Sequence, residues 1–200
     1  HDDGILSDYE DAAPAALAYT HAVWGLPGDF AALHATPAMR LAWAKRKTAL
    51  LIDFSHYLAD KVRGYRPHIK TARNFYALPL LQPDSEEWYA QSFPEFVKNY
   101  DYVAIEAMPF MEKAEHPEPW LQQLVQRAAA VSEGLNKTVF ELQAQDWNTQ
   151  KPIAMEVFNR QVELLRKLGV RHLGYYPDNL FDDQPRLADL QQHFALPGKH

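Results

Sequence analysis

Acidic and aromatic side chains gather at five points of this sequence where a β-strand is expected to end. The chain opens with His1, Asp2 and Asp3, and Asp8 follows in the same acidic segment. Four later segments begin with an apolar, β-favouring run and finish in the polar or aromatic residues Arg73, Asn74, Tyr76, Glu106, Glu141, Gln143, Trp147, Tyr175, Tyr176 and Asp178. Carboxyl groups at such positions can supply the acid that glycosidic cleavage needs, and aromatic rings can stack on sugars. The pattern is typical of a carbohydrate site.

Helical patterns separate these strand ends. The strands are expected within residues 68–78, 100–108, 138–144 and 170–176, and the helices over about 15–24, 37–63, 84–96, 119–128, 153–168 and 185–194. Strands that alternate with helices indicate parallel βαβ units. In a (β/α)8 barrel the active site forms at the carboxyl ends of the strands. We therefore predict an α/β fold of the TIM-barrel type, with these side chains lining its carboxyl-terminal face.

Local signals set the expected helix ends. Thr36 and Pro37 supply an N-cap and a proline at the first helical position of the long helix. Glu87, three residues after Asp84, predicts a capping box at the start of the next helix. Gly169 is the expected C′ stop of the helix over 153–168. On the long helix, one buried stripe is predicted to consist of Met39, Trp43, Leu50, Phe54, Tyr57 and Leu58.

The composition excludes several other classes of protein. The 200 residues are 47% hydrophobic and carry a formal charge of −6, which argues against a nucleic-acid-binding domain. No apolar run approaches the roughly 18 residues that a membrane span needs. Cysteine is absent and the nine histidines lack ligand spacing, so neither disulfides, a metal nor another cofactor is expected in this chain. Nucleotide-binding loops and nucleophile elbows are missing too.

The run of motifs HDDGILSDYED, HIKTARNFYALPLLQPDSEEWYAQ, NYDYVAIEAMPFME, VFELQAQDWN and GVRHLGYYPDN spans essentially the whole chain. It resembles the C-terminal glycoside hydrolase domain of PgaB-type poly-β-1,6-N-acetyl-D-glucosamine N-deacetylases. The resemblance implies a (β/α)8 barrel that binds and cleaves partially deacetylated polymer. It also implies a separate N-terminal deacetylase domain as partner, which this chain does not contain, and a periplasmic or outer-membrane-associated protein of biofilm exopolysaccharide systems.

The same resemblance assigns the catalytic acid to Asp2, the first aspartate of the His-Asp-Asp motif. The neighbouring Asp3 and Asp8 would raise the pKa of at least one carboxyl group by charge repulsion. Glu106 and Glu141 have two open interpretations: they line the site, or they are structural carboxylates, with Arg73 as a partner for Glu106. Arg73 itself is expected to order carboxylates and not to touch the substrate.

Several aromatic residues are candidates for contact with the substrate. Trp147 and Tyr76 are candidates for stacking on sugar rings. Tyr175 and Tyr176 are adjacent in a strand, so they point to opposite faces and at most one faces the site. Asp178 would add negative charge for a glucosammonium group.

Residues 1–200 are therefore predicted to form a single domain, the C-terminal portion of a barrel from the end of about strand 4 through helix 8. About three βα units and one strand body are expected upstream of His1. The predicted function is glycoside hydrolysis of partially de-N-acetylated polymer by an endo-acting enzyme. The alternative is a non-catalytic module that binds deacetylated polymer and guides it to export. The second catalytic group, the stereochemical course and the required acetylation pattern remain open.

Overall fold

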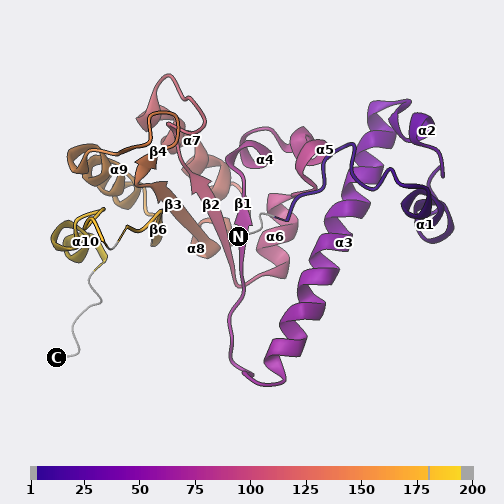
Figure 1. The fold of residues 1–200 in the computed structure, drawn as a ribbon, viewed down its shortest axis with the longest axis horizontal. Helices are drawn as coiled ribbons and strands as arrows, with labels where there is room; N and C mark the ends of the chain where they lie inside the picture. Colours follow the sequence, from indigo (N-terminus) through magenta and orange to yellow (C-terminus); the bar gives the residue numbers. More distant parts are fainter. Residues whose placement is uncertain (1–3, 180, 195–200) are drawn as a thin grey trace. The chain divides into compact units, whose positions relative to one another are not determined.

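The computed structural model describes residues 4–179 and 181–194, so Asp2 and Asp3 lie outside the described residues. The chain forms two compact units, His1–Tyr102 and Val103–His200 (Figure 1). From residue 72 onward, short strands are separated by helices, as the sequence predicts for an α/β protein.

The first unit is mostly helical. Its elements are α1 (Pro14–Trp24), α2 (Phe30–His34), α3 (Pro37–Arg63), β1 (Ala72–Phe75), α4 (Ala77–Leu81), the 3-10 turn η1 (Pro83–Ser85), α5 (Glu86–Tyr89) and α6 (Phe93–Asn99). The predicted cap of α3 is confirmed, because the Thr36 hydroxyl accepts a hydrogen bond from the Met39 amide. Thr48 of α3 donates to Glu86 of α5, and His56 of α3 contacts the Asn99 carbonyl at the end of α6. These contacts hold α3 against the helices that flank β1.

Two expectations for the first unit are wrong. The helix predicted from Asp84 is divided into η1, α5 and α6, because Ala90 adopts a left-handed conformation and Pro94 favours a new helix start. The predicted capping box does not form, since no side chain caps α5 and Glu87 instead pairs with Arg40 of α3 at 2.8 Å.

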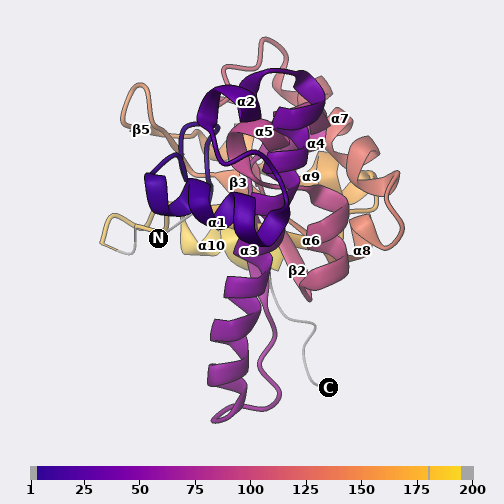
Figure 2. The same ribbon diagram turned by 90° about the vertical axis from the view of Figure 1, so that its right-hand side faces the viewer.

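The buried stripe of α3 also differs from the prediction. Trp43, Ala44, Lys47, Thr48 and Ile52 are buried, whereas Phe54, Tyr57 and Leu58 are 58%, 58% and 48% exposed. Figure 2 shows why: the carboxyl-terminal half of α3 extends beyond α1, α2 and α5. Within the described residues, the apolar face of this half of the helix is left open to solvent.

The second unit contains a parallel sheet with helices. Its elements are β2 (Tyr102–Ala107), which starts at the unit boundary, α7 (Pro117–Ala129), α8 (Gly134–Lys137), β3 (Thr138–Gln143), β4 (Gln145–Asp146), β5 (Lys151–Pro152), α9 (Met155–Lys167), β6 (His172–Tyr176) and α10 (Leu187–Phe194). Strands β2 and β3 pair in parallel, and so do β3 and β6. Helix α7 begins at Pro117, two residues before the predicted start, and Gly169 follows α9 with a left-handed backbone as expected.

The two faces of this sheet differ in burial. Val103, Ile105 and Ala107 of β2 and their register partners on β3, including Phe140 and Leu142, are fully buried. Leu121 and Leu124 of α7 and Val162 and Leu165 of α9 are also fully buried, and they form the core between sheet and helices. Glu106 and Glu141 alternate with the buried residues and lie on the opposite face. The period-2 alternation expected for β2 is confirmed.

Candidate functional site

Glu106 of β2 and Glu141 of β3 are register partners near the carboxyl ends of their strands. Neighbouring strands lie about 4.8 Å apart, so the two side chains leave the sheet side by side on the same face. Glu106 is only 7% exposed and Glu141 is half-buried. The sheet thus brings together two of the carboxylates that the sequence singles out.

Tyr176 and Trp147 extend this face toward β6. Gln143 and Tyr176 are register partners on β3 and β6, two residues beyond the Glu141–Gly174 pair, so Tyr176 lies on the glutamate face. The rings of Trp147 and Tyr176 lie 5.8 Å apart at 50°. The two rings form an aromatic surface beside the carboxylates.

Tyr175 points the other way. Its ring packs edge-on against Phe158 of α9 and Phe194 of α10, so it belongs to the helix-facing side of the sheet. Burial, and then the charge of Asp178 and a hydrogen bond to it, raise the pKa of the Tyr175 phenol. The structure therefore separates the two adjacent tyrosines: Tyr176 shares the face of the glutamates, and Tyr175 and Asp178 interact with each other.

Gln143 has a structural connection that the sequence does not reveal. Its side chain is fully buried, and its carbonyl oxygen accepts hydrogen bonds from the backbone amides of Phe110 and Met111, each at 2.9 Å. Its amide group donates to the Gln145 carbonyl at 2.8 Å. Gln143 thus ties the loop after β2 to the end of β3.

Trp147 is positioned by a small hairpin that the sequence analysis missed. Strands β4 and β5 pair in antiparallel fashion, and Trp147 is the first residue of their connection. Asp146 accepts hydrogen bonds from the Asn148 amide and the Thr149 hydroxyl, and these bonds hold the pKa of its carboxyl group low. The ionised Asp146 side chain thereby fixes the turn that carries Trp147.

In the first unit, Arg73 holds the segment that follows the His-Asp-Asp motif. The Arg73 guanidinium donates to the Gly4 carbonyl at 2.7 Å and lies 5.9 Å from the Phe96 ring. Gly4 has φ +56°, and a Cβ atom there would coincide with the guanidinium. Arg73 therefore orders the backbone next to Asp2 and Asp3.

Lys47 of α3 makes a second contact with this segment. Its ammonium donates to the Ser7 carbonyl at 2.5 Å and lies 4.1 Å from the Trp43 ring, although the side chain is 1% exposed. Burial lowers the pKa of Lys47, and the nearby carboxylates of Asp11 and Asp8 oppose that shift. The charge of Asp8 therefore acts on a buried cation. The sequence carries a weak signal for this role, since Lys47 is one helical turn from Trp43 on the same face.

Asn74 and Tyr76 lie in and after β1. Asn74 is half-buried and alternates with Arg73 and Phe75 along the strand. The Tyr76 amide donates to the Gln91 side chain at 2.9 Å, and the Tyr76 ring lies 5.0 Å from the Tyr89 ring. Because the Tyr89 carbonyl accepts from the Leu6 amide, Tyr76 belongs to the same cluster as the N-terminal segment.

The described residues contain no group of three or more histidines and carboxylates that could hold a metal ion. Within the same residues, no helix is both long and apolar enough to cross a membrane.

Comparisons with known proteins agree with the motifs. Residues 1–176 match the family model described as hypothetical glycosyl hydrolase family 13. The poly-β-1,6-N-acetyl-D-glucosamine N-deacetylases of Escherichia coli K12 and O157:H7 are each 40% identical to the chain over 202 residues. The alignment covers 98% of this chain and 30% of each relative, so the chain spans about a third of their length.

A solved structure is similar over nearly the whole chain. The PgaB (BpsB) glycoside hydrolase domain from Bordetella bronchiseptica has a TM-score of 0.93 and 48% identity, and covers 99% of this chain and 56% of its own. The resemblance to the PgaB-type domain is therefore confirmed. The chain belongs to the family described as hypothetical glycosyl hydrolase family 13 and is similar over nearly its whole length to the glycoside hydrolase domain of a PgaB-type protein.

Proposed function

We propose that the chain is part of a (β/α)8 glycoside hydrolase domain that binds and cleaves partially de-N-acetylated poly-β-1,6-N-acetyl-D-glucosamine. The observation that carries this proposal is the in-register pair Glu106 and Glu141, which lies beside the aromatic surface of Trp147 and Tyr176. Carboxylates next to an aromatic surface suit a sugar that carries an ammonium group, because the ring face can stack while the charge is neutralised.

Asp2 is the proposed general acid. Glycosidic cleavage passes through an oxocarbenium-like transition state, and the departing oxygen must receive a proton. The contacts of Gly4 with Arg73 and of Ser7 with Lys47 hold the segment just after Asp2. They support this proposal because a general acid needs a fixed position relative to the bond it protonates.

Glu106 and Glu141 are proposed to bind glucosamine units of the polymer. Their charge attracts glucosammonium, and the formal charge of −6 on the chain adds to that attraction. The parent protein is proposed to carry the deacetylase activity in another domain and to reside in the periplasm or at the outer membrane. This chain would then act on the product of its own partner domain.

The function is tested by digesting defined, partly deacetylated β-1,6-linked oligomers and sizing the products by mass spectrometry. Internal cleavage is the expected result. If the oligomers bind but stay intact, the chain is the non-catalytic export module and not an enzyme.

A calorimetric titration checks the electrostatic part of the proposal. Partly deacetylated oligomers should bind more tightly than fully acetylated ones, and the difference should shrink as salt rises, because screening shortens to about 8 Å at physiological ionic strength. Equal affinity for both kinds of oligomer would remove the role assigned to Glu106 and Glu141.

A further inference from the structure

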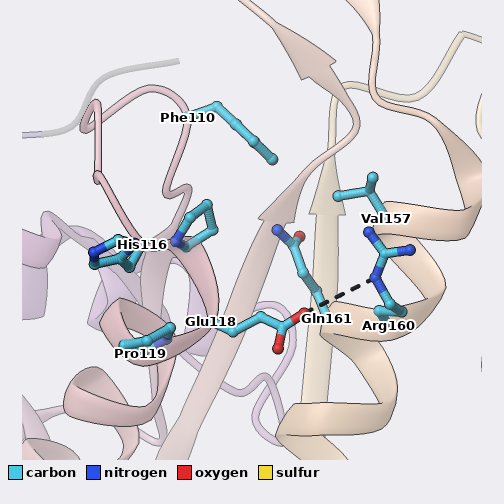
Figure 3. A pocket seen from close by; sticks show the side chains of 8 residues that line it. Phe110, His116, Glu118, Pro119, Val157, Arg160 and Gln161 are labelled. Atoms are coloured by element: carbon cyan, nitrogen blue, oxygen red, sulfur yellow. Dashed lines mark ion pairs between the residues drawn. The ribbon is translucent and has the colours of Figure 1, made fainter.

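A pocket of about 440 Å³ lies in the second unit between the start of α7 and the middle of α9 (Figure 3). Its walls are partly apolar, from Phe110, Pro119 and Val157. We call it the α7–α9 pocket. Both helices cover the face of the sheet opposite Glu106 and Glu141, so the helical walls of this pocket lie on the other side of the sheet from these two carboxylates.

Gln161 of α9 has an unusual position in this pocket. Its side chain is 1% exposed, and both the oxygen and the nitrogen of its amide are buried without a hydrogen-bond partner among the described residues. In Figure 3 the amide points from α9 into the space framed by Phe110, Glu118 and Val157. Buried polar groups are nearly always hydrogen-bonded, so an amide with two unsatisfied atoms indicates a partner that the chain does not supply.

An exposed ion pair lines the same pocket. Glu118 of α7 and Arg160 of α9 line the same pocket, and their charged groups lie 3.9 Å apart. Their side chains are 55% and 60% exposed. Exposed pairs of this kind contribute little to stability, so they can part at low cost and offer their charged groups to a ligand.

The aromatic wall has a fixed position. The Phe110 amide donates to the buried Gln143 side chain, as does the amide of Met111. This anchor ties the backbone of the loop that carries Phe110 to the end of β3. A preformed apolar wall with a few convergent polar groups is the usual form of a small-ligand site.

We propose that the α7–α9 pocket is a second sugar site that takes one N-acetylated hexosamine unit. The acetamido group has one N–H donor and one C=O acceptor, which are the complements of the two unsatisfied atoms of Gln161. Its methyl group and the ring face fit the apolar walls, while the hydroxyls can bond to Glu118 and Arg160. The choice of an N-acetylated sugar rests on the proposed function, because the proposed polymer contains this unit. The need for a ligand with an amide-like group follows from the two unsatisfied atoms of Gln161 alone.

The test measures binding of free N-acetylglucosamine to the whole chain by amide-detected NMR titration. A monosaccharide of this size is expected to bind with a Kd of about 1 mM, from the typical affinity per non-hydrogen atom. Two variants probe the pocket: Gln161→Met removes both amide atoms at nearly constant length, and Val157→Phe fills the pocket from its wall. The matched control is Gln126→Met, at an exposed position of α7.

Each pocket variant should weaken N-acetylglucosamine binding at least 10-fold, and the control should leave it unchanged. Gln161→Met should also melt no lower than the parent chain, because it removes an unsatisfied buried amide. Glucosamine, which lacks the acetamido group, should bind at least 10-fold more weakly than N-acetylglucosamine.

Three results would overturn the proposal. The parent chain shows no saturable binding of N-acetylglucosamine, or both pocket variants bind it as tightly as the parent chain does. The third is that the parent chain binds an acetylated glycine amide as tightly as N-acetylglucosamine. The last would assign the pocket to peptides and not to sugars. Cleavage of the polymer by Gln161→Met is measured in parallel and should persist. If the parent chain does not cleave the polymer but binds N-acetylglucosamine in a way that Gln161→Met weakens, the proposed function is refuted and the α7–α9 pocket remains a sugar site.

Discussion

Glu106 and Glu141 are register partners on adjacent parallel strands, at the same height and on the same face of the sheet. The spacing of about 4.8 Å between strands is compatible with the 5–5.5 Å that separates the two carboxyl groups of retaining glycosidases. The pair is nonetheless assigned to substrate binding, with Asp2 as the acid. Assistance by the N-acetyl group of the substrate, a known exception to the two-carboxylate rule, would then supply the second catalytic function.

That assignment predicts the effects of Glu106→Gln and Glu141→Gln. Each change removes one charge without changing the shape of the side chain, so KM for partly deacetylated oligomers should rise about 5-fold, corresponding to about 1 kcal/mol. The kcat should stay within the same order of magnitude, and cleavage should require an acetamido group at the cleaved sugar. Steady-state kinetics on defined oligomers measures both.

A loss of kcat of about 100-fold or more in either variant would contradict that assignment, because it would make the pair catalytic. Equal cleavage at a glucosamine that lacks the acetyl group would exclude assistance by the substrate.

Substitutions of the two adjacent tyrosines should differ in their effect on polymer binding. Tyr176→Ala removes a ring of the surface shared with Trp147, so polymer binding should weaken about 5-fold, equivalent to about 1 kcal/mol. Tyr175→Phe keeps the ring that packs on Phe158 and removes only the hydroxyl that bonds to Asp178. Its polymer affinity, measured by calorimetry, should equal that of the parent chain. If both variants lose a similar amount of polymer affinity, the assignment of Tyr176 to the sugar-binding face and of Tyr175 to the helix-facing side is contradicted.

A side chain at Gly4 should disturb the contact with Arg73, in addition to the ordinary cost of a left-handed backbone. Gly4→Ala places a Cβ where the Arg73 guanidinium lies, so the guanidinium must move and loses its hydrogen bond to the Gly4 carbonyl, which holds the segment next to the proposed acid. A misplacement of about 1 Å can reduce a rate about 100-fold, so cleavage should fall by that order.

Gly25→Ala is the matched control. Gly25 has a similar backbone, with φ +67°, but no atom lies within 4 Å of the added Cβ. Both variants carry the cost of a left-handed alanine, about 1–2 kcal/mol, and only Gly4→Ala also meets Arg73. Equal activity of the two variants would refute the role of Arg73 as the residue that orders this segment.

Asp101 should determine part of the acid stability. It accepts hydrogen bonds from the Thr71 amide and hydroxyl and from Lys70, which lower its pKa from 3.8 to about 2. A carboxyl group with a depressed pKa stabilises the fold above the pKa of the unfolded chain. That stability disappears as the pH falls from about 4 through about 2.

Asp101→Asn should therefore lower the free energy of unfolding at pH 7 by about 1 kcal/mol, because solvent screens the exposed pair with Lys70, and flatten its pH dependence between pH 4 and 2. Denaturant melts at several pH values measure this. Asp60→Asn, which breaks the exposed pair with Arg63, is the control and should change little. Equal effects of the two substitutions would contradict the assigned role of Asp101.

The sequence was most informative where periodicity and local signals coincide. The alternation around Glu106, the Thr36 cap and the stop at Gly169 all follow from short-range rules and are confirmed. The division of the helix after Asp84 was missed because Ala90 adopts a left-handed conformation for which its residue type gives no signal.

Tertiary contacts explain the remaining differences. Glu87 pairs with Arg40 of α3 and does not cap its own helix. This pair forms only because α3 packs beside α5. Phe54 and Tyr57 fit an apolar stripe in sequence, but the helix extends past the elements that would cover them. The anchor formed by Gln143 and the unsatisfied amide of Gln161 also depend on residues distant in sequence, and no local pattern reports them.

The most direct test of the central claim is product formation by Asp2→Asn on defined, partly deacetylated oligomers, sized by mass spectrometry. The substitution keeps the shape of the side chain and removes the proton that the departing oxygen needs. Cleavage should fall about 100- to 10,000-fold, while circular dichroism and oligomer binding stay those of the parent chain. Asp53→Asn, at an exposed position of α3, should cleave normally. Near-parental turnover by a folded Asp2→Asn chain would contradict the assignment of the acid to Asp2.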